Sequence, residues 1–182
     1  MGMTFAEKIF SEKSGKNVCA GEIVYVQPDI IMSHDNAYAV SASFYQLGAK
    51  KVKNPERIVL LFDHCTPPST QQYAINHKKV REFVLEQGIK NFFDIREGIC
   101  HQILPEKGFV SPGRLILGTD SHTTTYGAFG AFSCGIGRSE MSVIYATGEI
   151  WLRVPETMQI KLEGALPPGV YPKDAILYVT GQ

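Results

Sequence analysis

Short apolar runs alternate along this chain with longer amphipathic segments, and the alternation is its strongest structural signal. Runs of about four to eight apolar or β-branched residues are typical of strands buried on both faces. An alternating apolar and polar run near the end of the chain indicates a strand exposed on one face. Strands are therefore predicted over residues 22–26, 57–64, 89–95, 114–119 and, half exposed, 157–164.

The segments between these runs have helical spacing and recognisable end signals. Thr4 and Glu7 form a capping box, and Gly15 closes the first helix, over residues 4–14. Ser69 is the expected N-cap of the longest helix. The further helices are predicted over residues 37–48, 70–88, 139–152 and 172–181.

Alternating strands and helices predict an α/β fold, with three α/β/α layers and a mainly parallel sheet covered by helices on both faces. No repeat and no linker-like stretch divides the sequence, so residues 1–182 are expected to form a single α/β domain. Residues 127–137 are small and rich in glycine, which predicts that they pack closely against another part of the chain.

Composition narrows the class of function. The chain has 182 residues, 44% of them hydrophobic, with 18 basic and 18 acidic side chains. This balance gives no reason to expect nucleic acid or a membrane as a partner. The N-terminus does not have the pattern of a signal peptide. The four cysteines have no C-x-x-C spacing, so free thiols in a reducing cytoplasm are expected, and a metal site built from them is not.

Polar residues gather where the predicted strands end. His34, His64, His101 and His122 all lie at such positions, whereas His77 falls within a predicted helix and is expected to be an ordinary surface residue. Ligands of open parallel sheets bind beyond the carboxyl ends of the strands. These four histidines are therefore expected to share one cleft with the acids beside them, Asp63 and Asp120.

A carboxylate beside an imidazole fixes its tautomer and stabilises its charged form, which suits proton transfer near neutral pH. The same residues could instead serve as helix caps and structural hydrogen bonds. A zinc or iron site on His64, His101 and His122 is a further alternative. A serine hydrolase is not favoured, because Ser121 lacks the G-x-S-x-G turn. The signatures of a phosphate-binding loop and of a dinucleotide-binding fold are also absent.

Four segments, "LLFDHCTP", "IREGICHQILPEKG", "GTDSHTTTYGAFGAFSCGIGRSE" and "VPETMQIKLEG", resemble the aconitase superfamily in their order and spacing. The nearest similarity is to the large subunit of the 3-isopropylmalate dehydratase and homoaconitase branch. It covers essentially the whole chain and implies an N-terminal domain of the aconitase type. It also implies a hydro-lyase that isomerises a hydroxy di- or tricarboxylate by dehydration and rehydration, with a [4Fe–4S] cluster as Lewis acid.

The resemblance also implies roles for individual residues. Asp63 and His64 would protonate the departing hydroxyl group. His101 and Asp120 would form the second pair, near the iron-bound water. The remaining polar side chains expected at the same centre are His122 as a catalytic residue and Ser121, Thr123 and His34 as substrate-binding residues.

The sequence also departs from the family pattern. The position that corresponds to a substrate-binding glutamine of aconitases lies near Ala39 in this chain. This difference favours a substrate other than citrate. The cysteine ligands of the cluster and the substrate arginines lie further along in family members, so no metal ligand is expected in this chain. The expected partners are the rest of a large subunit and a small subunit with a serine base. A non-catalytic binding or assembly module with the same fold is the alternative.

Overall fold

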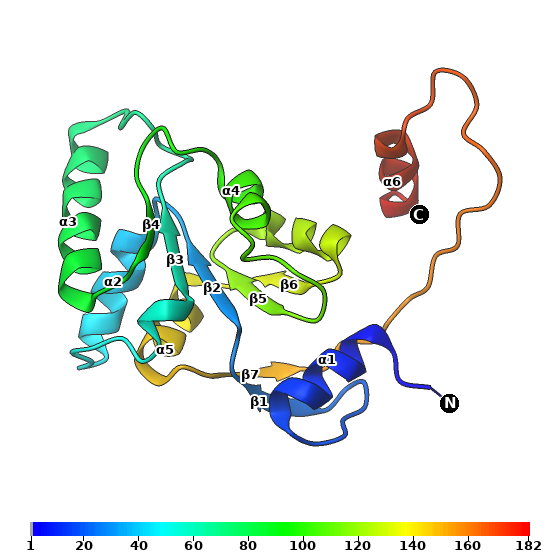
Figure 1. The fold of residues 1–182 in the computed structure, drawn as a ribbon, viewed down its shortest axis with the longest axis horizontal. Coiled ribbons are helices and arrows are strands. Elements are labelled where there is room, and N and C mark those ends of the chain that lie inside the picture. The colour runs from blue at the N-terminus through cyan, green and yellow to red at the C-terminus, as the bar shows by residue number, and fades with distance from the viewer. Residues whose placement is uncertain (1) are drawn as a thin grey trace.

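A computed structural model describes residues 2–182 of the chain. A parallel sheet of five strands, in the order β4-β3-β2-β5-β6, lies at its centre (Figure 1). A separate antiparallel pair joins β1 to β7. The strands are β1 (Ile23–Val26), β2 (Ile30–Ser33), β3 (Ile58–Leu61), β4 (Asn91–Phe93), β5 (Leu115–Gly118), β6 (Phe132–Gly135) and β7 (Ile150–Arg153).

Helices cover both faces of the sheet. One core cluster packs α2, α3 and α5 against side chains such as Ile31 and Leu60. The other packs α4 against the alternate side chains, such as Met32 and Val59. The predicted α/β fold, with a parallel sheet flanked by helices, is therefore confirmed. The helices are α1 (Phe5–Ser14), α2 (Ala37–Gln46), α3 (Gln71–Gln87), α4 (Cys100–Glu106), α5 (Arg138–Thr147) and α6 (Pro172–Thr180), with two 3₁₀ segments, η1 (Pro55–Arg57) and η2 (Ser121–Phe129).

The buried strands explain why this sequence forms a parallel sheet. Every residue of β2, β3 and β5 is buried. Ile31 pairs with Ile58 on one side and with Leu117 on the other, so the three strands run in register. Continuous apolar runs of this kind suit strands with a helical layer above and below. The carboxyl ends of the three strands consequently meet at one edge of the sheet.

The predicted N-caps of α1 and α3 have different outcomes. Thr4 accepts from the Glu7 amide at 3.2 Å while Glu7 accepts from the Thr4 amide at 2.8 Å, so the capping box is confirmed. The N-cap of α3 is Thr70 and not Ser69, because the Thr70 hydroxyl accepts from the Tyr73 amide at 3.2 Å.

Two predictions near the C-terminal end are corrected. The helix predicted over 139–152 ends at Thr147, because Gly148 takes a left-handed conformation with φ of 82°. The chain then continues as β7, which pairs with β1. No strand forms over 157–164, where the described residues have no regular structure and no neighbouring strand to pair with.

The last 28 residues differ from the rest. Val154 is fully buried, but none of residues 155–182 is buried, and α6 carries several exposed apolar side chains. Figure 1 shows α6 standing away from the sheet at the end of an extended segment. The compact part of the structure thus ends near Val154. Among the described residues, no helix has the length and apolar character needed to cross a membrane.

Candidate functional site

Three strand ends and one helix bring the candidate residues together. His34 and Asp35 follow β2, and Asp63 and His64 follow β3. Asp120 follows β5, two residues beyond its end. His101 enters from the first turn of α4. Parallel strands direct all of these ends to one edge of the sheet, as the sequence predicted.

An unbroken chain of contacts joins two histidines and two carboxylates. Nδ1 of His64 lies 2.6 Å from Oδ1 of Asp63, and Nε2 of the same ring lies 3.2 Å from Oδ2 of Asp120. The other carboxylate oxygen of Asp120 lies 3.1 Å from Nε2 of His101. The order is therefore Asp63–His64–Asp120–His101. Each Asp–His pair was expected from the sequence, but the link between them through Asp120 was not.

The electrostatics of this chain favour a charged His64. Partial burial opposes protonation, but the hydrogen bond and charge of Asp63, with the charge of Asp120, raise the pKa of His64 above its usual value. Burial also opposes ionisation of Asp120. The hydrogen bond from the His122 amide and the charges of His101 and His64 nevertheless lower the pKa of this carboxyl. An imidazolium between two carboxylates is the form that satisfies all of these contacts.

Asp120 is held by the start of η2. Its carboxylate accepts from the His122 amide at 2.7 Å, and its carbonyl accepts from the Thr123 hydroxyl at 2.6 Å. Gly135 of β6 packs directly beneath, where a Cβ atom would stand 2.6 Å from the Asp120 carbonyl oxygen. The close packing predicted for the glycine-rich segment is therefore found at Gly135, and it supports the site.

A second Asp–His pair lies beneath the first. The carboxylate of Asp35 accepts from the backbone amides of Asp63 at 3.0 Å and His64 at 2.8 Å. Its other oxygen lies 2.8 Å from Nε2 of His77. His77 is only 1% exposed and stacks on Phe62 with ring centroids 4.0 Å apart. The prediction that His77 is an ordinary surface residue is therefore wrong.

The sequence carried one usable signal for this buried pair. Residues at positions i, i+3 and i+7 of a helix share a face, and His77, Val80 and Val84 have this spacing. All three are buried in the inner face of α3. An inward-facing histidine needs a polar partner, which Asp35 provides.

His34 stacks on His64, with ring centroids 4.0 Å apart. Nε2 of His34 lies 3.1 Å from the Thr119 carbonyl oxygen. Burial and the positive charge of the neighbouring His64 lower the pKa of His34. A neutral imidazole thus lies against a charged one, which limits the repulsion between the two rings.

The remaining candidates divide by exposure. Ser121 and His122 are exposed, and the His122 side chain is 78% accessible with Nδ1 3.6 Å from Asp120. Thr123 is fully buried and its hydroxyl is already bonded to the Asp120 carbonyl. Ser121 and His122 can therefore reach a bound molecule directly, while Thr123 stabilises the turn that presents them.

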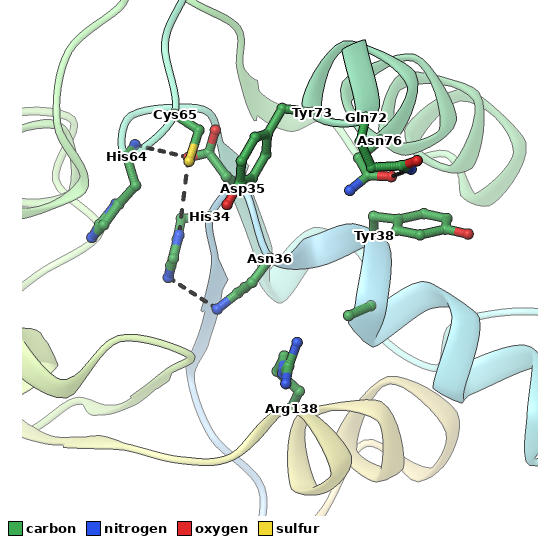
Figure 2. Close-up of a pocket in the computed structure, with 11 residues that line it drawn as sticks. His34, Asp35, Asn36, Tyr38, His64, Cys65, Gln72, Tyr73, Asn76 and Arg138 are labelled. Atoms are coloured by element: carbon green, nitrogen blue, oxygen red, sulfur yellow. Dashed lines mark hydrogen bonds and ion pairs between the residues drawn. The ribbon is translucent and has the colours of Figure 1, made fainter. Parts of the chain in front are cut away.

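A cavity of about 430 Å³ opens beside His34 and His64. Figure 2 shows its walls, with Arg138 rising from the start of α5 toward Asn36 and the side chains of α2 and α3. Polar side chains line the cavity, but most of its lining surface is apolar, and its volume is large enough for a small organic acid. Its other lining residues are Asp35, Tyr38, Ala39, Cys65, Gln72, Tyr73 and Asn76.

The four cysteines do not form a cluster site. Cys19 is exposed, Cys100 is buried, and Cys65 and Cys134 are partly exposed. Burial and the nearby charge of Asp63 raise the pKa of Cys100, which disfavours the thiolate that metals bind. No cysteine belongs to either group of potential metal ligands among the described residues. The residues present do not fit the ligand set of a [4Fe–4S] cluster.

The histidines also fall into two groups, which does not match the mononuclear metal site considered as an alternative. One potential ligand group contains His34 and His64, and the other contains His101 and His122. Within each group the candidate atoms lie within 4.8 Å of one another. Neither group of described residues contains His64, His101 and His122 together.

Comparison with known proteins agrees with the resemblance of the motifs. A family model described as the Aconitase family (aconitate hydratase) matches residues 7–182. The 3-isopropylmalate dehydratase large subunit 1 of Methanopyrus kandleri is 51% identical over 183 residues, covering 100% of this chain and 44% of that protein. The corresponding large subunit of Aquifex aeolicus is 47% identical over 184 residues, covering 100% of this chain and 43% of that protein.

A probable methanogen homoaconitase large subunit from Methanothermobacter thermautotrophicus is 45% identical over 186 residues, covering 99% of this chain and 44% of that protein. The chain thus spans less than half the length of the curated relatives it matches. The matched region includes both the compact part and the exposed C-terminal segment. On this match of sequence and family model, the chain belongs to the aconitase family.

Proposed function

We propose that this chain forms the proton-transfer side of a hydro-lyase active site, as the N-terminal portion of a dehydratase large subunit. The enzyme would isomerise a hydroxy di- or tricarboxylate by removing water and adding it back at the neighbouring carbon. The observation that carries the proposal is the continuous chain Asp63–His64–Asp120–His101 at the carboxyl ends of the strands. The solvent-exposed face of His64 would meet the substrate.

His64 is the proton donor in this proposal. Both of its ring nitrogens face carboxylate oxygens, which only accept hydrogen bonds, so the ring carries two protons. During dehydration the carbon–oxygen bond breaks and the hydroxyl group leaves with a proton from His64. The electron pair for the new double bond comes from the neighbouring carbon–hydrogen bond, whose proton goes to a base outside this chain. The reverse steps return the water.

The pair of His101 and Asp120 complements the pair of His64 and Asp63. His101 and His64 share Asp120, so a proton lost by one ring changes the charge felt by the other. Ser121 and His122 are exposed next to Asp120 and would contact the substrate oxygens. His34, neutral beneath His64, would line the floor of the site, and buried Thr123 would hold the loop.

The parts that this chain does not provide would come from its partners. A [4Fe–4S] cluster would have its cysteine ligands in the rest of the large subunit. The base would come from a small subunit, because the relatives are named as large subunits. The same names favour 3-isopropylmalate or a homoaconitate-type acid as substrate.

The test is reconstitution. A complete large subunit that begins with this chain is combined, without oxygen, with its small subunit. The mixture is assayed on 3-isopropylmalate, homocitrate-type acids, dimethylmalate-type acids and citrate. We expect turnover of at least one malate derivative and little of citrate. An assembled, cluster-loaded pair that acts on none of these acids would overturn the proposal, and citrate as the best substrate would overturn its choice of substrate.

A further inference from the structure

His101 lies on a helix that its own hydrogen bonds stabilise poorly. α4 has only seven residues and contains Pro105. A proline has no amide, so it cannot donate to the carbonyl oxygen four residues earlier, which here belongs to His101. The N-cap residue, Ile99, makes no side-chain capping bond. Helices this short depend on packing for their stability, so contacts from other segments must fix the position of His101.

Three contacts from outside α4 hold this part of the helix. Oδ2 of Asp63 accepts from the Cys100 amide at 2.7 Å. The Tyr126 hydroxyl donates to the Cys100 carbonyl oxygen at 3.2 Å. Oδ1 of Asp120 lies 3.1 Å from Nε2 of His101. Both backbone polar groups of the residue before His101 are thus bound by side chains outside the helix.

Tyr126 also contacts the imidazole of His101. The two ring centroids are 5.8 Å apart, and the ring planes are inclined by 50°. A single contact with Asp120 fixes the distance of Nε2 but not the plane of the imidazole, because the χ2 torsion of histidine has broad minima. The Tyr126 ring limits that rotation. Asp120 is the N-cap of η2 and Tyr126 lies within it, so one 3₁₀ segment holds the imidazole at two points.

Tyr126 can act only through the residues that it touches. Its side chain is fully buried within this chain, in the core that packs α4 against the sheet, so neither a substrate nor another subunit reaches it. Burial raises the pKa of Tyr126, so the hydroxyl keeps its proton and can donate to Cys100. A phenylalanine would fill the same space, and packing alone therefore does not explain the hydroxyl.

We propose that Tyr126 is a positioning residue for the proposed reaction: its hydroxyl fixes the Cys100 peptide, and its ring keeps His101 directed at Asp120. These two residues complete the chain of contacts that begins at Asp63, and a rotated His101 would break it at the last step. A misplacement of about 1 Å can lower turnover about 100-fold. The inference rests on the proposed function and adds to it a residue that touches no substrate.

The experiment is a double-mutant cycle on the assembled, cluster-loaded two-subunit enzyme. Tyr126→Phe removes only the hydroxyl and should lower kcat about 3- to 10-fold, the effect of losing one hydrogen bond, with KM changed by less than about 2-fold. Tyr126→Leu also removes the ring and should lower kcat about 10- to 100-fold at a temperature where it stays folded. In a His101→Gln background, each change should lower kcat by less than about 2-fold further, because its route through His101 is already lost.

Tyr145→Phe is the matched control. Tyr145 is also fully buried, and its hydroxyl lies 3.1 Å from that of Ser33, but it belongs to the core on the other face of the sheet. This change should leave kcat within about 2-fold of the wild type. Losses that multiply in the double variants, an unchanged kcat in both Tyr126 variants, or an equal loss in Tyr145→Phe would overturn the inference and leave the proposed hydro-lyase intact.

NMR of the large subunit with isotope-labelled histidine gives a second reading without turnover. The ring signal of His101 is the one lost in His101→Gln, and the signal of His77 is the one lost in His77→Gln. Tyr126→Phe should shift the His101 signal and leave the His77 signal in place. An unshifted His101 signal would overturn the inference. A shifted signal in an assembly that acts on none of the acids would support the inference and refute the proposed function alone.

Discussion

Two of the Asp–His pairs among the described residues have similar geometry and opposite surroundings. Asp63 and His64 lie 2.6 Å apart, and the His64 side chain is 43% exposed. Asp35 and His77 lie 2.8 Å apart, and the His77 side chain is 1% exposed. Only the first pair can pass a proton to a ligand, since the second is covered by Phe62 and the surrounding core. Solvent access, and not the pairing itself, distinguishes the two roles.

The buried pair also supports the exposed one. Asp35 accepts hydrogen bonds from the backbone amides of both Asp63 and His64, so it fixes the turn that presents the proposed proton donor. His77 in turn holds the Asp35 carboxylate in place. A buried carboxylate with three donors is strongly satisfied, which offsets the cost of removing it from water. The exposed pair is thus the one proposed to move protons, and the buried pair is the one that positions it.

The largest expected effect is on turnover. His64→Ala removes the proposed proton donor, so kcat of the assembled enzyme should fall about 100- to 10,000-fold, the usual contribution of a positioned acid. The free energy of unfolding should change by less than about 1 kcal/mol, because His64 is an exposed side chain. Steady-state kinetics and urea unfolding of the same preparation measure both quantities.

His77→Gln changes the buried pair and is measured in the same two ways, by kinetics and by urea unfolding. It should destabilise the protein and leave kcat within about 10-fold of the wild type in the fraction that stays folded. If His77→Gln lowered kcat as much as His64→Ala at a temperature where both are folded, the distinction between the two pairs would fail.

The next effect is on stability. Asp35→Ala leaves two backbone amides and His77 without their acceptor, so the free energy of unfolding should fall by about 3 kcal/mol. Asp35→Asn keeps one acceptor oxygen and should lose less. Chemical denaturation of the chain measures both changes. A loss below about 1 kcal/mol in Asp35→Ala would show that water replaces the carboxylate and that the turn does not depend on it.

The sequence revealed the exposed pair more readily than the buried one. Asp63–His64 follows an apolar run that had to be a buried strand, and parallel strands bring their carboxyl ends together, so its place in a site was predictable. The contact of His64 with Asp120 was not, because it depends on the spatial order of β2, β3 and β5. The spacing of His77 with Val80 and Val84 indicated an inward face, but its partner Asp35 lies 42 residues away in the sequence, so the role of His77 was missed.

Contacts between segments far apart in the chain also explain the errors in the predicted secondary structure. Gly148 ends α5 in a left-handed conformation, yet the apolar residues after it continued a pattern that also suited a helix. Their pairing with β1 is a contact over more than 120 residues, which no local pattern contains. The alternating residues 157–164 had a strand pattern without a partner strand, and in the described chain they form no strand.

A smaller effect is expected where β6 supports the loop of Asp120. Gly135→Ala would place a methyl group 2.6 Å from the Asp120 carbonyl oxygen, so the loop must shift. Overpacking of this kind costs about 1–3 kcal/mol, and activity should fall with it because Asp120 links the two histidines. Gly127→Ala is the matched control, since nothing lies within 4 Å of its added Cβ atom. Equal stability and activity of the two variants would argue against this packing.

The smallest effect concerns pH and tests the charge of the exposed pair alone. The pKa of His64 is raised above 6.5 in the folded protein, so below about pH 6.5 both folded and unfolded chains hold the proton and its stabilising contribution is complete. As the pH rises from there through the raised pKa, that contribution is lost. The lowered pKa values of Asp35 and Asp120 act at lower pH, and the lowered pKa of His34 acts with the opposite sign, up to about pH 6.5. Urea unfolding from about pH 7 to about pH 9 should therefore show a decline in stability that His64→Gln reduces. An identical decline in His64→Gln would mean that another group titrates there and that His64 is not held as an imidazolium between Asp63 and Asp120.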